Sequence, residues 1–285
     1  MKITLGQLLI EGGEPERNLE RAGLMVCQAA QVGSDLLLLP ETLDFAWTHP
    51  SALNEAEPIP GRFSDQLCRY AKEAEIFICA GLTERCGDKN YNAALLIDRS
   101  GTISLVYHKI NLLQVELPYY QVGTTLRAVD TEFGRIGVNI CADNYIDGLP
   151  IGHTLARMGA QIILSPSSWT SSFSVNESQH PYREKWLKPF LTLAKLYGLV
   201  VASSTSVGYI VGGPYEGTKM VGCSLVVGAN GLIAEGPFNE FAGAVIHTEF
   251  EVPEQDIRGT AFGERLRSLG YRFDDWQWEK IRTIH

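Results

Sequence analysis

Short apolar runs rich in leucine, isoleucine and valine recur along the whole chain and are separated by polar or glycine-containing segments. Runs of this length and composition predict β-strands. The expected strands are Ile3–Ile10, Leu36–Leu39, Ile76–Leu82, Ala93–Asp98, Thr102–Tyr107, Arg135–Ile140, Ile162–Ser165, Leu199–Ser203, Cys223–Val227, Leu232–Glu235 and Ala244–Thr248.

Longer amphipathic stretches lie between several of these runs. The expected helices are Glu16–Val32, Phe63–Glu75, Leu149–Met158 and Tyr182–Tyr197. In the first of them, Leu19, Ala22, Val26 and Ala29 recur at helical spacing and form one apolar face. Strands separated by amphipathic helices predict an α/β protein.

One arrangement occurs twice: a helix, an apolar strand and then a hairpin with a glycine turn. The two turns are Ser100-Gly101 and Asn230-Gly231, and the second is a strong hairpin signal. Two similar halves, each a mixed sheet covered by helices on one face, can stack sheet against sheet. We therefore predict a four-layer α-β-β-α sandwich, with residues 1–285 forming one domain.

The segment 252–285 differs from the rest because it is charged and yet carries several large aromatic side chains. These are Phe262, Phe273, Trp276 and Trp278. Aromatic side chains of this size need burial. We expect this C-terminal tail to pack either on its own domain or on a partner subunit.

Composition restricts the class of protein. The 285 residues are 45% hydrophobic and carry a net charge of −9 with no basic stripe, which argues against nucleic acid and anionic membranes as partners. The six cysteines show no C-x-x-C pair, which is typical of reduced thiols in the cytoplasm. The first residues are typical of a strand rather than a signal peptide, and no apolar run could span a bilayer. We expect a cytoplasmic protein.

Three side chains of complementary chemistry each follow an apolar run: Glu41 in LLLLPET, Lys109 in SLVYHKINLL and Cys141 in IGVNICADNY. Taken singly, each is typical of a solvated strand end or an inert buried thiol. Together they occupy strand exits, where ligands bind in open α/β sheets. A carboxylate can take the thiol proton, and an ammonium can stabilise an oxyanion. The three residues therefore predict nucleophilic catalysis.

The segments around these residues resemble the signature regions of the nitrilase superfamily of carbon–nitrogen hydrolases. They are LLLLPET, VYHKINLL and GVNICADNYID, followed by LARMGAQIILSPSSW and later by KMVGCSLVVGANGLIAEG. The resemblance implies the sandwich fold, a catalytic set of Glu41, Lys109 and Cys141, and no metal or cofactor. A second family carboxylate, seven residues before a glycine, matches Glu116. The resemblance also implies a homodimer or a larger homo-oligomer.

The residues after the cysteine depart from the pattern of several family members. Many amidases have an aromatic residue directly after the cysteine, where this chain has Ala142. Hydrolases of N-carbamoyl amino acids tend to place arginine nearby, where this chain has Asn144 and Tyr145. That Asn-Tyr pair instead resembles true nitrilases. The resemblance thus implies the reaction class and leaves open whether the substrate is an amide, a carbamoyl compound or a nitrile.

We expect hydrolysis of a small linear amide or carbamoyl compound, with release of ammonia or an amine. Glu41 accepts the Cys141 proton, Lys109 and the Ala142 backbone N–H hold the oxyanion, and Glu116 positions the water. The residues expected to line the substrate pocket are Tyr119, Ala142, Asn144, Tyr145 and Trp169.

Three other functions stay open from the sequence. The protein could be a true nitrilase, an acyltransferase that passes a thioester-bound acyl group to an amine, or an interaction protein without catalysis. Metal-dependent hydrolases and NTPases lack support, because the chain has neither an H-E-x-x-H motif nor a P-loop.

Overall fold

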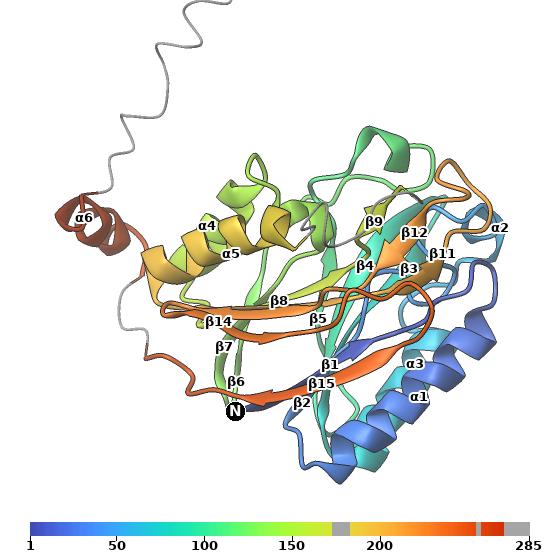
Figure 1. Ribbon diagram of the computed structural model, residues 1–285, viewed down its shortest axis with the longest axis horizontal. Helices are drawn as coiled ribbons and strands as arrows, with labels where there is room; N and C mark the ends of the chain where they lie inside the picture. The colour runs from blue at the N-terminus through green and yellow to red at the C-terminus, as the bar shows by residue number, and fades with distance from the viewer. Residues whose placement is uncertain (173–182, 255–257, 271–285) are drawn as a thin grey trace, which may run out of the picture.

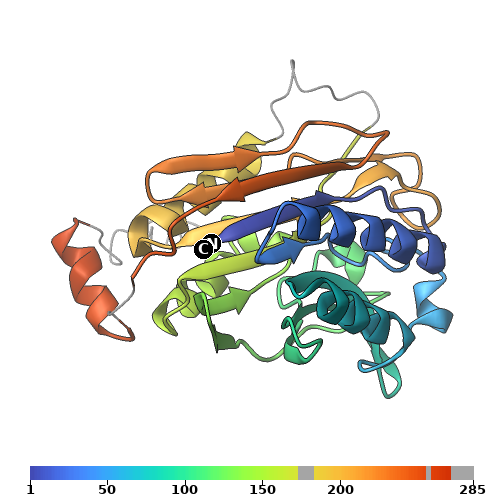
Figure 2. The same cartoon turned by 90° about the horizontal axis from the view of Figure 1, so that it is seen from below.

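The computed structural model describes residues 1–172, 183–254 and 258–270. Two six-stranded mixed sheets stack face to face, with a pair of helices outside each sheet (Figures 1 and 2). This is the predicted four-layer α-β-β-α sandwich. No helix within the described ranges is long and apolar enough to cross a membrane.

The first sheet has the strand order β15-β1-β2-β3-β4-β5. Its central strands β1, β2 and β3 are parallel, whereas β15 and the β4–β5 hairpin pair antiparallel at the two sides. The strands are β1 (Lys2–Gln7), β2 (Leu36–Leu38), β3 (Phe77–Cys86), β4 (Lys89–Ile97), β5 (Ile103–His108) and β15 (Ala244–Glu249).

The second sheet repeats this plan in the order β6-β7-β8-β10-β13-β14. Strands β7, β8 and β10 are parallel, flanked by antiparallel β6 and by the β13–β14 hairpin. The strands are β6 (Ala128–Thr131), β7 (Gly134–Val138), β8 (Ile162–Ser167), β10 (Val200–Thr205), β13 (Leu225–Gly228) and β14 (Gly231–Glu235). Both predicted hairpin turns are confirmed, and Gly101 and Gly231 adopt φ values of 84° and 128° there.

Alternation along the strands divides the core into two parts. In β2, Leu36 and Leu38 belong to the cluster shared with the second sheet, whereas Leu37 belongs to the cluster beneath the helices of the first sheet. All three side chains are fully buried. The leucine run is therefore apolar without alternation because both faces of the strand are covered.

Two helices cover each sheet on its outer side (Figure 2). Helices α1 (Pro15–Gln31) and α3 (Arg62–Ala74) pack together over the first sheet, and α4 (Leu149–Arg157) and α5 (Glu184–Tyr197) pack over the second. The apolar face predicted for the first helix is buried as expected. All four predicted helices are confirmed, with ends that differ by at most two residues.

Several short elements were not predicted. They are α2 (Ala52–Glu55), the 3₁₀ helices η1 (Gln114–Glu116) and η2 (Cys141–Asn144), strand β6 of the second sheet, strands β9 (Thr170–Ser171), β11 (Val207–Tyr209) and β12 (Lys219–Val221), and α6 (Ala261–Ser268). Strands β9, β11 and β12 form a small sheet in the order β11-β12-β9. Apart from the eight-residue α6, these elements have two to four residues and carry too little periodicity to stand out.

Two strand boundaries need correction near functional positions. The strand expected to run to Ile140, directly before Cys141, ends at Val138. Cys141 is instead the first residue of η2. The first strand ends at Gln7 rather than Ile10. In both cases apolar residues continue past the last strand residue because they remain buried in irregular backbone.

The C-terminal tail packs, as far as residue 270, on its own subunit. Phe262 of α6 is fully buried and meets the Tyr197 ring of α5 edge-on at 4.9 Å between centroids. Phe273, Trp276 and Trp278 lie outside the described residues. Their predicted burial, including the exchange onto a partner subunit, stays a prediction.

Candidate active site

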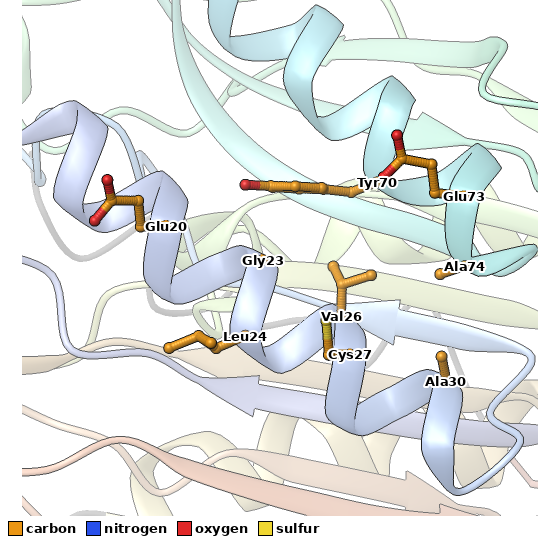
Figure 3. A pocket seen from close by; sticks show the side chains of 9 residues that line it. All are labelled: Glu20, Gly23, Leu24, Val26, Cys27, Ala30, Tyr70, Glu73 and Ala74. Atoms are coloured by element: carbon orange, nitrogen blue, oxygen red, sulfur yellow. The ribbon is translucent and has the colours of Figure 1, made fainter.

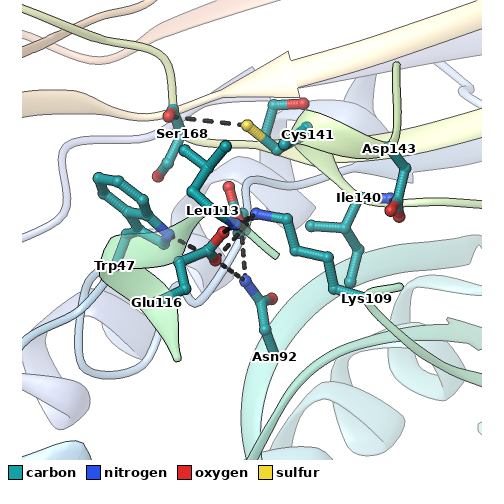
Figure 4. A network of polar contacts seen from close by, with 12 residues as sticks. Trp47, Asn92, Lys109, Leu113, Glu116, Ile140, Cys141, Asp143 and Ser168 are labelled. Carbon is teal, nitrogen blue, oxygen red and sulfur yellow. Dashed lines mark hydrogen bonds and ion pairs between the residues drawn. The ribbon is translucent and has the colours of Figure 1, made fainter. Parts of the chain in front are cut away.

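The three side chains singled out by strand-exit position come together at one edge of the two sheets: Figure 4 shows Lys109 beside Cys141, and Lys109 contacts Glu41. Glu41 follows β2, Lys109 directly follows β5, and Cys141 follows β7 of the opposite sheet. The backbone N–H of Glu41 donates to the Ser167 carbonyl oxygen at 3.3 Å, which joins the first sheet to the second beside the site. Sheet stacking thus assembles residues that are distant in the chain.

Lys109 is buried between two carboxylates. Its Nζ lies 2.8 Å from Glu41 Oε1, and 2.9 and 3.0 Å from the two carboxylate oxygens of Glu116. None of the three side chains is more than 1% exposed. Glu116, which resemblance alone implied, is therefore a direct partner of Lys109 in the structure.

Two further residues of this network escaped sequence reasoning. Asn92 of β4 donates from Nδ2 to Glu41 Oε1 at 2.6 Å and also contacts Glu116 Oε1 at 3.3 Å. Trp47 donates its indole N–H to Glu116 Oε1 at 2.8 Å. An asparagine inside a strand and a tryptophan in a loop are common in any core, so no local signal distinguished them.

The two carboxylate oxygens of Glu41 have different surroundings. Glu41 Oε2 is buried without a hydrogen-bond partner within the described residues, whereas Oε1 contacts both Lys109 and Asn92. Gly81 of β3 permits the close approach of this segment, because a Cβ there would lie 2.5 Å from Glu41 Cα. An unpartnered buried oxygen next to a thiol is suited to accept a proton.

Cys141 sits on a strained turn. Its φ of 41° lies in the left-handed region that non-glycine residues rarely adopt, a feature that concentrates at functional sites. The side chain is 7% exposed, and Sγ makes a long contact of 3.9 Å with the Ser168 carbonyl oxygen. Ala142 follows in the first turn of η2, where backbone N–H groups have no acceptor within the helix.

Asp143 connects the cysteine turn to the end of the lysine strand. Its carboxylate accepts hydrogen bonds from the Tyr107 hydroxyl at 2.7 Å and from the backbone N–H groups of Ile140 and Asn111 at 2.8 Å each. Tyr107 lies in β5, two residues before Lys109, and Ile140 directly precedes the cysteine. The relative positions of ammonium and thiol are therefore set by a buried acceptor.

The electrostatics of the site keep the nucleophile protonated at rest. Burial raises the pKa of the Cys141 thiol well above its ordinary value, and the Glu41 carboxylate adds to this effect. Burial also raises the pKa of Glu41, against the opposing Lys109 charge. Burial by itself would lower the pKa of Lys109, but Glu116 and Glu41 outweigh it and raise that pKa well above normal. The site thus holds a stable ammonium and a thiol that needs a base.

The expected pocket residues occupy different surroundings. Tyr145, at the end of η2, is half-buried and stacks on Trp186 of α5 at 5.0 Å between ring centroids. Tyr119 is half-buried beside Tyr120. Trp169 is fully buried in a parallel stack with Trp186 at 4.5 Å. The rings of Trp169, Trp186 and Tyr145 therefore lie on the cysteine side of the site, whereas Tyr119 follows the 3₁₀ helix of Glu116.

Asn144 is also fully buried, and internal hydrogen bonds occupy its amide. It exchanges hydrogen bonds with Asn139 at 2.8 and 3.0 Å and donates to Ser165 Oγ at 2.8 Å. These bonds connect the cysteine turn to β8. The predicted contact of Asn144 with substrate stays a prediction.

A separate groove lies on the outer layer between α1 and α3 (Figure 3). Its volume is about 700 Å³, and its lining includes Leu24, Cys27 and Tyr70, with Glu20 and Glu73 at its sides. None of the four candidate catalytic residues lines it. This groove therefore has no part in the chemistry at the sheet edge.

A known protein family matches almost the entire chain. The family model for carbon-nitrogen hydrolases matches residues 2–254, and the chain belongs to this family. Met1 and the tail after residue 254 lie outside the match.

The curated relatives are named for different activities. The chain is 31% identical over 173 residues to a nitrilase of Pyrococcus abyssi, covering 59% of this chain and 65% of that protein. It is 30% identical over 179 residues to an omega-amidase of Xenopus laevis, covering 59% of this chain and 63% of that protein. The chain thus spans less than two thirds of the length of these relatives.

Solved structures show the same fold over almost the entire length. An amidase from Nesterenkonia matches with a TM-score of 0.76 and 19% identity, covering 95% of this chain and 98% of that chain. A second structure of that amidase, with the same TM-score and identity, carries acrylamide added to its active-site cysteine. At this identity the likeness establishes the fold.

Proposed function

We propose that this protein is a cysteine-dependent amidase that hydrolyses small linear amides or carbamoyl compounds. One observation supports it most: a thiol on a strained turn lies beside a buried Glu–Lys–Glu network in which Glu41 Oε2 has no hydrogen-bond partner among the described residues. The names of several relatives, omega-amidase and deaminated glutathione amidase, point to the same bond type.

In the proposed first half-reaction, Glu41 accepts the thiol proton while Cys141 sulfur attacks the substrate carbonyl. The oxyanion then receives hydrogen bonds from Lys109 Nζ and the Ala142 backbone N–H. As the C–N bond breaks, Glu41 returns the proton to the leaving nitrogen. Ammonia or an amine departs, and a thioester to Cys141 remains.

In the second half-reaction, water attacks the thioester and Glu41 accepts one of its protons. The second tetrahedral oxyanion occupies the same donors, and the thiolate leaves and is reprotonated. Glu116 holds Lys109 in place throughout, because both of its oxygens contact Nζ within 3.0 Å. In this role Glu116 acts through the lysine and orients the site for the incoming water.

Intact-mass spectrometry with a panel of small amides tests the proposal directly. Wild-type protein is expected to gain one acyl mass and to release ammonia without an added amine acceptor. Cys141→Ala is expected to form no adduct and to lose activity by about 10⁴-fold or more. Cys79→Ala, at another buried cysteine on β3, is the matched control. An adduct that persists in Cys141→Ala contradicts the proposal.

A nitrile substrate is the second candidate, because the relative in Pyrococcus abyssi is named a nitrilase. Parallel assays with amides and the corresponding nitriles separate the two functions. Product formation that requires an added amine would instead identify an acyltransferase. A chain that forms no adduct with any of these compounds would be an interaction protein.

We further propose that the protein is a cytoplasmic homodimer or larger homo-oligomer. Support comes from the outer face of α5, where Leu187 and Leu191 lie in a shallow surface groove with Lys188 and Thr192. Light scattering of the purified protein measures the mass directly. A monomeric mass over a wide concentration range contradicts the assembly, and cell fractionation tests the location.

A further inference from the structure

Trp47 contacts Glu116 and also a tyrosine from a distant loop. Its indole N–H donates to Glu116 Oε1 at 2.8 Å, as Figure 4 shows, and its side chain is only 6% exposed. The half-buried Tyr215, in the loop between β11 and β12, packs on the Trp47 ring at 5.2 Å between centroids, with the ring planes tilted by 35°. The β11–β12 loop therefore touches a direct partner of the buried network.

This loop also packs closely against the loop that follows β2. Gly213 has a φ of 75°, and a Cβ there would lie 2.5 Å from the Thr48 carbonyl oxygen. A Cβ at the neighbouring Gly212 would lie 3.1 Å from two ring atoms of His49. At Gly213 no larger residue fits unless the two loops separate. Because Thr48 directly follows Trp47, this contact holds Tyr215 and Trp47 together.

Glu116 receives hydrogen bonds from several donors at once. Its Oε1 accepts from Trp47 at 2.8 Å and from Lys109 Nζ at 2.9 Å, and its Oε2 accepts from Lys109 at 3.0 Å and from the Leu113 backbone N–H at 2.8 Å. Lys109 Nζ has three hydrogens, and it also donates to Glu41 and, in the proposed mechanism, to an oxyanion. Without Trp47, Glu116 would compete more strongly for these hydrogens, because a buried acceptor that loses a donor is costly.

We propose that Tyr215 is a positioning residue of the reaction: it holds Trp47 against Glu116 and thereby keeps Lys109 available to the oxyanion. Tyr215 acts through the Trp47 ring and needs no contact with substrate. The inference rests on the proposed amidase function and adds the β11–β12 loop to the parts of the chain that determine its rate. Loss of the Tyr215 ring is therefore expected to lower kcat and to leave KM nearly unchanged.

Steady-state kinetics on the amide that wild type hydrolyses fastest measures this effect. Trp47→Phe keeps a ring but lacks the N–H, and kcat is expected to fall about 10- to 100-fold because a hydrogen bond to a charged group is lost. Tyr215→Ala is expected to lower kcat about 3- to 10-fold, as for the loss of an aromatic pair, with KM within about two-fold of wild type. Tyr215→Phe is expected to restore kcat. Tyr70→Ala, at a half-buried tyrosine on α3, is the control.

A double-mutant cycle tests whether Tyr215 acts through Trp47. In Trp47→Phe the indole N–H is absent, so the addition of Tyr215→Ala is expected to change kcat by less than about two-fold more. Independent roles would instead multiply the two losses. Thermal unfolding of each variant verifies that the fold is intact.

Two glycines of the same loop provide a second test. Gly213→Ala places a methyl group against Thr48, so the loop must move, and it is expected to lower kcat as Tyr215→Ala does. Gly217 has a similar φ of 83°, but a Cβ there has no described neighbour within 4 Å apart from the adjacent residues. Gly217→Ala therefore carries the backbone strain without the clash, and kcat is expected to stay within about two-fold of wild type.

Alkylation of Cys141 by iodoacetamide gives a readout that needs no turnover: sulfur bonds to the CH₂ carbon, iodide leaves, and Glu41 accepts the proton. Burial and the Glu41 carboxylate raise the pKa of Cys141, whereas the Lys109 ammonium lowers it. Glu116 raises it to a lesser extent, and Lys109 also opposes the effect of burial on the pKa of Glu41. If Lys109 is drawn toward Glu116 in Tyr215→Ala, the pH midpoint of alkylation is expected to move upward. Easier access to the thiol would instead raise the rate without moving the midpoint.

The possible outcomes distinguish this inference from the proposed function. If wild type forms an acyl-enzyme and Tyr215→Ala turns over at the wild-type rate, the positioning role is wrong and the amidase proposal stands. A raised KM with unchanged kcat also refutes the role, because Tyr215 would then contact substrate. If wild type forms no acyl-enzyme with any amide, the proposed function fails. The alkylation midpoint then decides the inference, and an unchanged midpoint in both Tyr215→Ala and Trp47→Phe refutes it.

Discussion

At the scale of single residues, the site contains two buried carboxylates that share the same few hydrogen-bond donors. Glu41 and Glu116 share one ammonium, Lys109, and one amide, that of Asn92. Buried charges are costly unless they are paired and hydrogen-bonded. The donors to Glu41 therefore lower the pKa of this carboxyl group. A change in that pKa is expected to change the pH dependence of catalysis.

The acidic limb of the pH–rate profile is predicted to follow Glu41. The base must be ionised, so activity is lost as pH falls through its pKa, which burial raises above the ordinary value of 4.5. The Asn92 hydrogen bond lowers that pKa. Asn92→Ala is therefore expected to move the midpoint of the acidic limb of kcat/KM to higher pH.

The matched control is Asn90→Ala on the same strand, where the amide donates to the Ala52 carbonyl oxygen instead. It is expected to leave the midpoint unchanged. A shift to lower pH in Asn92→Ala, or equal shifts in both variants, would show that Glu41 does not set the acidic limb.

At the scale of elements, the segment after β2 is a strained loop that carries two site residues. Thr42, Ala46 and Thr48 have φ values of 43°, 70° and 58°, which non-glycine residues adopt only when the surroundings enforce them. Asp44 supplies part of that enforcement, because its carboxylate accepts the backbone N–H of Thr83 in β3 at 2.8 Å. The loop is therefore tied to the adjacent strand by a buried acid.

Asp44 is predicted to make the stability of the protein depend on pH. Burial raises the pKa of Asp44 from 3.8 to about 7 in the folded state. Between these values the folded protein binds more protons than the unfolded chain, so the free energy of unfolding falls as pH rises from about 4 to 7. An asparagine at this position could not titrate, so Asp44→Asn would lack this decline. The difference in the free energy of unfolding between Asp44→Asn and wild type is therefore expected to rise by about 2 to 4 kcal/mol between about pH 4 and 7.

Urea unfolding at several pH values measures this difference. Asp65→Asn, at an exposed carboxyl group on α3, controls for the loss of one negative charge. A difference between Asp44→Asn and wild type that stays constant with pH would refute the titration of Asp44 in this range.

At the scale of the whole molecule, the two sheets and the tail form one packed unit. Apolar residues from both sheets belong to a single buried cluster, which also contains Phe262 and Leu266 of α6. The candidate site lies at the edge where the two sheets meet, so neither half could form it alone. This arrangement supports the expectation that the chain is one domain.

Removing the α6 anchor is predicted to destabilise the entire fold. Phe262→Ala deletes a fully buried ring and is expected to lower the free energy of unfolding by about 3 kcal/mol or more. Because the ring packs on Tyr197 of the same chain, this loss should not vary with protein concentration. Leu269→Ala, at a residue that is 64% exposed, is the control. A loss that depends on concentration would indicate that the tail packs on a partner.

The sequence by itself determined the helices, most strands and both hairpins, and it singled out the three strand-exit residues of the candidate site. These features depend on local periodicity, on turn chemistry and on residue types at strand ends, all of which act over a few neighbouring positions. The strand exits at Glu41, Lys109 and Cys141 could therefore be recognised before any contact was known. Glu116 needed the additional resemblance to a family.

Only the tertiary structure decided which side chains complete the site. Trp47 reaches Glu116 across 69 positions of the chain, and Asn92 reaches Glu41 across 51. Such contacts depend on strand order and sheet stacking, which local patterns do not encode. The stacking of Trp186 of α5 on Trp169 and on Tyr145 has the same origin, since α5 must first pack on the second sheet. The candidate strand-exit residues were thus readable from short segments, whereas the contacts that complete the site depend on distant elements brought together by folding.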